Sequence, residues 1–259
     1  MSIVGTRPPL ISETNLYEPH HKASPAVYYA AKAMKVPVVQ TIHNFRLLCP
    51  GATFYRDGHI CEDCVEHGLK CAVKHSCYRG SKAQTLACVL STWFHRMTGI
   101  YGKISYICLT DFNRNKLLEL KQVKSDKVFV KPNFVESIGK YIPEDQRKNQ
   151  FVFVGRLDKL KGIDTLFNAW EKLGERAPKL IVCGTGPMEE WCKKFLTNHK
   201  VNIEMKGFVS NIEARKLIAI SRALILPTRW YEGFPMGKQT MRVGKILGEY
   251  IFSRERTGI

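Results

Sequence analysis

Three short segments of the chain decide its fold: FVFVGRLDKLKG at residues 151–162, CGTGP at 183–187 and WYEGFP at 230–235. Each follows a short run of β-branched or aliphatic residues, which is typical of a buried parallel strand. A strand that ends in glycine, followed by basic residues and a helix, brings backbone N–H groups and cations to the place where a diphosphate would bind. One such turn is weak evidence, but three in one half of the chain indicate a phosphate-binding α/β domain.

The second half of the chain alternates between predicted strands and predicted helices. We expect strands at 151–154, 180–183, 201–205 and 223–227, with helices at 163–173, 188–196 and 212–220 between them. This alternation predicts a parallel, doubly wound sheet, in which ligands bind beyond the carboxyl ends of the strands.

The first half predicts a second α/β lobe with a weaker pattern. We expect helices at 26–34, 86–98 and 112–120, the last capped by Asp111, and strands at 37–42, 104–109 and 127–130. The Cys- and Gly-rich stretch 49–80 is too irregular to predict a regular element. The expected organisation is an atypical segment 1–24, a lobe at 25–136, a polar linker at 137–150, a lobe at 151–236 and a divergent tail at 237–259.

The charge of the chain points to anionic partners. The 259 residues carry 40 Lys and Arg against 23 Asp and Glu, a formal net charge of +17. The basic residues are scattered and not interleaved with aromatic residues, which argues against nucleic-acid binding. Nucleotide diphosphates, contact with an anionic membrane surface, or a simple gain in solubility explain the charge instead. The sequence shows no spanning apolar run and no leader, so we expect a cytoplasmic protein, with the inner face of the membrane as an alternative location.

Together with Thr41-Ile42-His43-Asn44 and the stretch VKPNFV at 130–135, the three segments resemble the family 4 glycosyltransferases, also called glycosyl transferases group 1. The resemblance covers residues 24–236. It implies a GT-B fold of two facing Rossmann-like lobes and transfer of a sugar from a nucleotide-diphosphate donor, with retention of configuration and without a cofactor.

Arg156 and Lys161 are five residues apart across a strand-to-helix turn, where both cations can reach one diphosphate. Gly155 allows close approach of the backbone, and the resemblance implies that the two cations neutralise the leaving diphosphate. It also implies that Glu232 holds the donor sugar. A second glutamate of the family would fall at Thr240, whose hydroxyl cannot clasp a ribose diol as a carboxylate does.

The resemblance implies further contacts to the donor. Gly184 and Gly186 would approach the nucleotide by their backbone, although a plain tight turn explains the same residues. Phe208 and Val209 would border the base, with a core role as the alternative. The remaining donor contacts would come from Gly233, Phe234 and Pro235.

His43 ends a predicted strand at the ligand-binding edge, so we expect it to lie against the donor sugar or the acceptor. In this family the departing phosphate oxygen is commonly thought to deprotonate the acceptor. If a side chain acts as the catalytic base instead, we expect it to be His43. The resemblance identifies no protein nucleophile.

The cysteines of the irregular stretch raise a separate question. Cys61 and Cys64 form a CxxC pair, and with Cys77 and either Cys49 or Cys71 they would supply four zinc ligands. Reduced, structurally placed thiols are the alternative, since disulfides are rare in the cytosol.

We therefore expect a hexosyltransferase that acts on a glycan or lipid-linked acceptor. The alternative is a non-catalytic remnant that keeps half of a nucleotide-diphosphate site. We expect both lobes to be incomplete, because residues 1–24 lack the family's opening strand and the resemblance stops at Met236.

Overall fold

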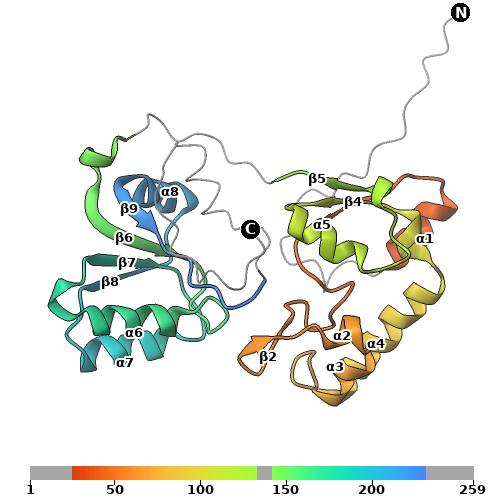
Figure 1. The fold of residues 1–259 in the computed structure, drawn as a ribbon, viewed down its shortest axis with the longest axis horizontal. Helices are drawn as coiled ribbons and strands as arrows, with labels where there is room; N and C mark the ends of the chain where they lie inside the picture. Colours follow the sequence, from red (N-terminus) through yellow and green to blue (C-terminus); the bar gives the residue numbers. More distant parts are fainter. Residues whose placement is uncertain (1–24, 133–141, 232–259) are drawn as a thin grey trace, which may run out of the picture. The chain divides into compact units, whose positions relative to one another are not determined.

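The computed structural model describes residues 25–132 and 142–231 (Figure 1). The chain divides into two compact units, the first formed by residues 1–54 and 61–132 and the second by 55–60 and 133–259. Several predicted features lie outside the described residues: Glu232, Gly233, Phe234, Pro235, Thr240, the segment 1–24 and the tail.

The first unit contains a parallel sheet of three strands in the order β1-β4-β5, formed by Val39–Ile42, Ser105–Cys108 and Val128–Val130. Its helices are α1 (Ala26–Ala33), α2 (Asp63–Glu66), α3 (Lys70–Lys74), α4 (Lys82–Met97) and α5 (Asp111–Leu118), with 3-10 turns η1 (Ile100–Lys103) and η2 (Ser125–Lys127). These bounds confirm the predicted helices and strands of this half to within a few residues.

Two expectations for this half are wrong. Thr110, not Asp111, caps α5, because its hydroxyl oxygen accepts the backbone N–H of Asn113 at 3.1 Å. The stretch 49–80 does hold regular elements, namely α2, α3 and the hairpin β2 (Tyr55–Arg56) and β3 (His59–Ile60), which is grouped with the second unit. Asp57 and Gly58 form its turn with positive φ at both positions, as tight hairpins require.

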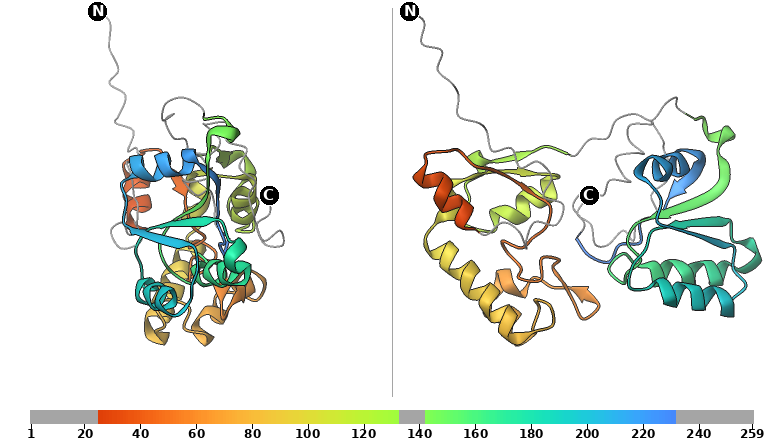
Figure 2. Two further views of the ribbon diagram at one scale, coloured as in Figure 1. Left: turned by 90° about the vertical axis from the view of Figure 1, so that its left-hand side faces the viewer. Right: turned by 180° about the vertical axis from the view of Figure 1, so that it is seen from behind.

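The second unit is a doubly wound sheet, as predicted. Its four parallel strands have the order β8-β7-β6-β9, formed by Ile203–Gly207, Lys179–Cys183, Lys148–Val154 and Ser221–Leu224. Its helices are α6 (Ile163–Leu173), α7 (Glu189–Asn198) and α8 (Asn211–Ile220), with 3-10 turns η3 (Glu144–Gln146) and η4 (Gly174–Arg176). Helices α6 and α7 cover one face of the sheet and α8 the other (Figures 1 and 2).

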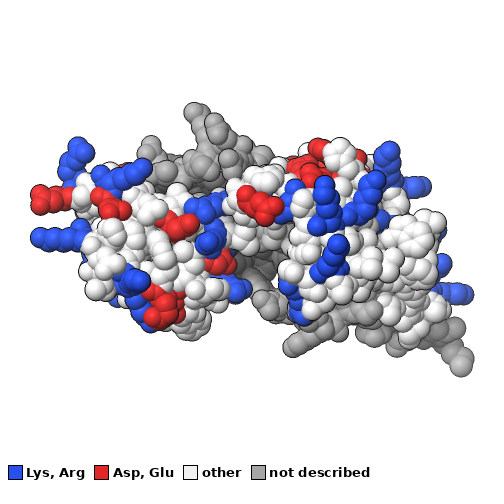
Figure 3. Space-filling model, turned by 90° about the horizontal axis from the view of Figure 1, so that it is seen from below, with Lys and Arg blue, Asp and Glu red and all other residues white. Residues whose placement is uncertain are grey.

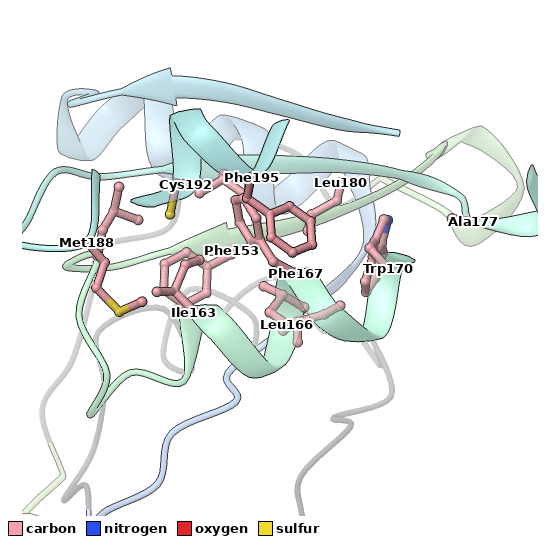
Figure 4. Close-up of a cluster of buried hydrophobic side chains, with 13 residues drawn as sticks. Phe153, Ile163, Leu166, Phe167, Trp170, Ala177, Leu180, Met188, Cys192 and Phe195 are labelled. Atoms are coloured by element: carbon pink, nitrogen blue, oxygen red, sulfur yellow. The ribbon is translucent and has the colours of Figure 1, made fainter. Parts of the chain in front are cut away.

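Two apolar clusters hold this sheet between its helices. Under α6 and α7, Phe153 packs with Phe167 and Phe195 (Figure 4), and under α8, Val152 packs with Ile218. Phe153 and Val152 are neighbours in β6, so their side chains point to opposite faces, and both are buried because helices cover both faces. The buried residues of α6 recur at the spacing of one helical face: Ile163, Leu166, Phe167 and Trp170. Among the helices of the described residues, none combines the length and the apolarity needed to cross a bilayer.

Candidate functional site

Three glycine turns meet at the carboxyl edge of the second unit's sheet. The backbone N–H of Gly155, after β6, donates to the carbonyl of Cys183 at the end of β7 (3.0 Å). The N–H of Gly184, after β7, donates to the carbonyl of Gly207 at the end of β8 (2.7 Å). The turns of three neighbouring strands are therefore joined into one continuous edge, where the parallel order predicts that a ligand binds.

The glycines at this edge are required by close backbone packing. A Cβ on Gly184, which has φ +138°, would lie 1.9 Å from the carbonyl oxygen of Gly155. A Cβ on Gly162, with φ +69°, would lie 2.0 Å from the carbonyl oxygen of Pro227. Real side chains do not tolerate such distances, so the turns can pack against one another only with glycine at these positions.

The turn between β6 and α6 carries the predicted cations. Arg156 is exposed, with 63% of its side chain accessible, and its Nε lies 3.6 Å from a carboxylate oxygen of Asp158. The same carboxylate accepts the backbone N–H of Lys161 at 2.8 Å. Asp158 therefore shapes the loop that presents both cations, beside the N-terminus of α6 with its partial positive charge. Sequence reasoning missed this residue, although an acceptor three residues before Lys161 was a visible signal.

The third segment packs against the first. The backbone N–H of Arg229 donates to the carbonyl of Leu160 (2.9 Å), and its guanidinium pairs with Asp164 of α6 (3.0 Å). The Lys161 ammonium lies 5.8 Å from the centre of the Trp230 ring. The indole N–H of Trp230 is buried and has no hydrogen-bond partner among the described residues. The start of the third segment is thereby held against the first segment at this edge.

Phe208 and Val209 differ in their surroundings. Phe208 is 81% exposed just after β8, whereas Val209 packs against the buried cluster under α8. Phe208 is therefore free to contact a ligand, and the Val209 side chain contributes to the core. Gly186 lies in the same edge, since its Cβ would be 2.5 Å from the carbonyl oxygen of Leu157.

His43 lies in the first unit, directly after β1, at the carboxyl end of that unit's own sheet. Partial burial lowers the pKa of its imidazole, which favours the neutral form at pH 7. A neutral imidazole can accept a hydrogen bond at one ring nitrogen and donate one from the other. Its place beside the donor sugar or the acceptor stays a prediction.

The five cysteines singled out from the sequence belong to one neighbourhood of the first unit. Cys64 is buried with Leu69 and Ala72, and Cys71 and Cys77 pack against this cluster. Burial, and to a smaller extent the charge of the other four cysteines, raises the pKa of the Cys64 thiol to about 12. Within residues 25–132 and 142–231, no three His, Cys, Asp or Glu side chains are grouped as a metal site requires. A zinc site at Cys49, Cys61, Cys64 and Cys77 stays a prediction, which the metal content of the purified protein tests.

Comparison with known proteins finds similarity over the unit that carries this edge. Residues 134–237 match the family described as "Glycosyl transferases group 1". It is the same family that the sequence motifs resemble, and the match covers most of the second unit. Over 109 residues the chain is 36% identical to an uncharacterized glycosyltransferase, MJ1607, of Methanocaldococcus jannaschii, a match covering 40% of this chain and 26% of the relative.

Solved structures support the same fold. Anabaena HepE matches 83% of this chain and 54% of its own length, with a TM-score of 0.53 and 14% identity. S. aureus TarM, in a mutant form, matches 63% of this chain and 32% of its own, with a TM-score of 0.50 and 20% identity. The predicted fold class is confirmed: α/β units with parallel sheets that match GT-B structures over part of their length. The chain spans about a quarter of the curated relative and about half or less of these structures.

Proposed function

We propose that the second unit of this group 1 member binds the diphosphate of a nucleotide-sugar donor at its carboxyl edge. The protein would then be a retaining glycosyltransferase that moves a hexosyl group to a glycan or lipid-linked acceptor. One observation carries the proposal: Gly155 and Gly184 bring two turns into contact, and Arg156 and Lys161 extend from the first of them. A helix N-terminus and two cations at one edge suit a diphosphate.

The ligands of two structural relatives support a uridine base as part of this proposal. Anabaena HepE was solved in complex with UDP and with UDP-glucose, and S. aureus TarM with UDP among its ligands. We therefore assign a uridine nucleotide to this chain as the first donor to test. Exposed Phe208 is placed to border the base, since aromatic faces stack on nucleobases.

In this proposal Arg156 and Lys161 neutralise charge that develops on the leaving diphosphate as the glycosidic bond breaks. Glu232 would hold the donor sugar. His43, in the first unit, would contact the sugar or the acceptor, where a neutral imidazole could take a proton.

One feature of the sequence favours a second candidate function, namely binding of the nucleotide without turnover. The position of the family's second glutamate holds Thr240. Loss of a charge-assisted hydrogen bond to the ribose costs roughly 1.5–3 kcal/mol, or about ten- to a hundredfold in affinity. Such a chain would keep half of a nucleotide-diphosphate site and transfer little sugar.

Transfer or hydrolysis with a panel of nucleotide sugars separates the two functions. A transferase consumes at least one sugar nucleotide, and Arg156→Ala lowers kcat/KM by about ten- to a hundredfold because a charged contact is lost. The matched control is Lys172→Ala, which removes one exposed cation from the far end of α6 and should change nothing. Binding of UDP with no turnover of any sugar nucleotide would favour the second candidate. A chain that neither binds UDP nor consumes any sugar nucleotide would exclude both candidate functions.

A further inference from the structure

The stretch 225–231, which leads into the third segment, lies in neither a helix nor a strand. Its position therefore depends on contacts with the rest of the unit. Pro227, Arg229 and Trp230 each contact the turn between β6 and α6. Arg229 makes two kinds of contact, because its backbone binds the turn and its side chain binds the helix that follows.

The side chain of Arg229 is a third cation near this edge, but it is already engaged. Its guanidinium lies 3.0 Å from a carboxylate oxygen of Asp164 and donates to the hydroxyl of Thr165, and both residues belong to the first turn of α6. The Arg229 side chain is 32% accessible, against 63% for Arg156. The two arginines therefore have different roles: Arg156 extends from the edge, and Arg229 joins two parts of it.

The carboxylate of Asp164 depends on this partner. Its side chain is 22% accessible, and the oxygen nearest Arg229 is buried and has no hydrogen-bond partner among the described residues. A buried carboxylate oxygen without a hydrogen bond or a counter-ion is costly. The ion pair with Arg229 is thus the compensation for this oxygen.

The position of Asp164 connects this ion pair to ligand binding. Asp164 lies in the first turn of α6, where the end of the helix carries a partial positive charge. An unpaired carboxylate at this place would compete with an anionic ligand for that charge and would repel the ligand. Pairing with Arg229 offsets the carboxylate, so that the helix end still favours an anion.

Ion pairs are common on the second unit, so a pair alone indicates no function. On the face of this unit that Figure 3 shows, basic and acidic side chains lie beside one another. A pair such as Lys179 with Glu204, at 46% and 40% accessible, contributes little because water screens it. The pair of Arg229 with Asp164 is less exposed, and it joins the stretch 225–231 to the helix that follows the first segment.

We propose that Arg229 is a positioning residue for the donor, and that it acts through Asp164. The ion pair anchors the stretch 225–231 on α6, where Trp230 lies beside Lys161. It also offsets a negative charge at the helix end where the diphosphate would bind. This inference rests on the proposed function, because it takes a diphosphate as the ligand of this edge.

Calorimetric titration with UDP and with UMP tests the role, since UDP carries one phosphate more. Arg229→Ala should lower the affinity for UDP at least fivefold and that for UMP less, because the uncompensated carboxylate repels the more anionic ligand. Arg229→Lys keeps the charge and should retain most of the preference for UDP. The double variant Arg229→Ala with Asp164→Asn removes the repelling charge and should regain at least twofold in UDP affinity over Arg229→Ala.

The matched control is Arg222→Ala. It removes an exposed arginine at the start of β9, the opposite edge of the sheet, and should bind UDP as the parent does. Circular dichroism checks that each variant is folded. A merely structural role of Arg229 would lower the affinities for UDP and UMP alike, and Asp164→Asn would not reverse the loss.

A double-mutant cycle measures the ion pair without any ligand. In urea unfolding, Arg229→Ala with Asp164→Ala should cost less than the sum of the two single variants, because each single variant already breaks the pair. An additive cycle, an unchanged preference for UDP in Arg229→Ala, or a loss that Asp164→Asn does not reverse would overturn the proposal. If the parent chain binds no UDP, the proposed function fails and the positioning role fails with it. Failure of the positioning role alone leaves the UDP affinity of the parent intact.

Discussion

Gly184 and Gly155 touch at the ends of β7 and β6: a Cβ on Gly184 would lie 1.9 Å from the carbonyl oxygen of Gly155. The two residues belong to different signature segments, about thirty positions apart in sequence, and are brought together by the parallel pairing of Val154 with Cys183. The contact makes a single binding edge of two turns, and it makes the edge intolerant of a side chain at Gly184.

Gly184→Ala should therefore damage both stability and nucleotide binding. A methyl group would press on backbone atoms that cannot move away, and we expect a loss of about 3 kcal/mol or more in the free energy of unfolding. Gly174→Ala is the matched control, because Gly174 also has a positive φ (+56°) but nothing within 4 Å of its Cβ position. Its cost should be only about 1–2 kcal/mol, from backbone strain alone. Urea unfolding of both variants measures the difference, and equal losses would show that the contact with Gly155 does not matter.

Asp158 should matter through the loop that it shapes. Its carboxylate accepts the Lys161 N–H and lies beside Arg156, so Asp158→Ala should lower the free energy of unfolding by about 0.5–1.5 kcal/mol and weaken UDP binding. Asp158→Asn keeps an acceptor oxygen and should retain most of the stability. Urea unfolding and calorimetric titration check both variants, with Glu175→Ala at the opposite end of α6 as the exposed-carboxylate control. The role is refuted if Asp158→Ala behaves like the control.

Buried thiols should make the protein sensitive to alkaline pH. Burial raises the pKa of Cys64 to about 12 and the pKa values of Cys183 and Cys192 to about 11, against an ordinary value of 9.0. The folded state holds these protons more tightly than the unfolded state does. Their contribution to stability is fully present below pH 9 and is lost as pH rises through 11 to 12.

Urea unfolding at a series of pH values measures this loss. We expect the free energy of unfolding to fall above about pH 9, and the fall to be shallower in the variant Cys64→Ala. An unchanged slope in that variant would contradict the raised pKa of Cys64.

The second unit could be predicted closely from its sequence. The helix predicted at 163–173 has those bounds in the structure, because its apolar residues keep one helical face and Gly162 precedes it in a left-handed conformation. The glycine turns after the strands could also be predicted from the sequence. The structure gives the reason for Gly184, because a Cβ there would clash with the backbone of the neighbouring parallel strand's turn. Local pattern and tertiary structure agree there.

Other features depend on contacts that no local pattern shows. The elements at 55–74 are two to five residues long, too short to display a period. Thr110 and Asp111 are both good capping residues. The backbone conformation of the folded chain, extended at Thr110 and helical from Asp111, shows that Thr110 is the cap. Helix α4 exposes several apolar side chains, which opposes the usual expectation that apolar residues lie inside. Trp230 joins the site because the third segment packs on the first.

The central claim is that the carboxyl edge of the second unit binds a diphosphate, and calorimetric titration with UDP and with UMP tests it most directly. We predict that UDP binds at least about tenfold more tightly than UMP, because the second phosphate gains charge-assisted hydrogen bonds. Arg156→Ala should remove most of this preference and Lys172→Ala should keep it. Equal affinities for UDP and UMP, or an unchanged preference in Arg156→Ala, would contradict the account.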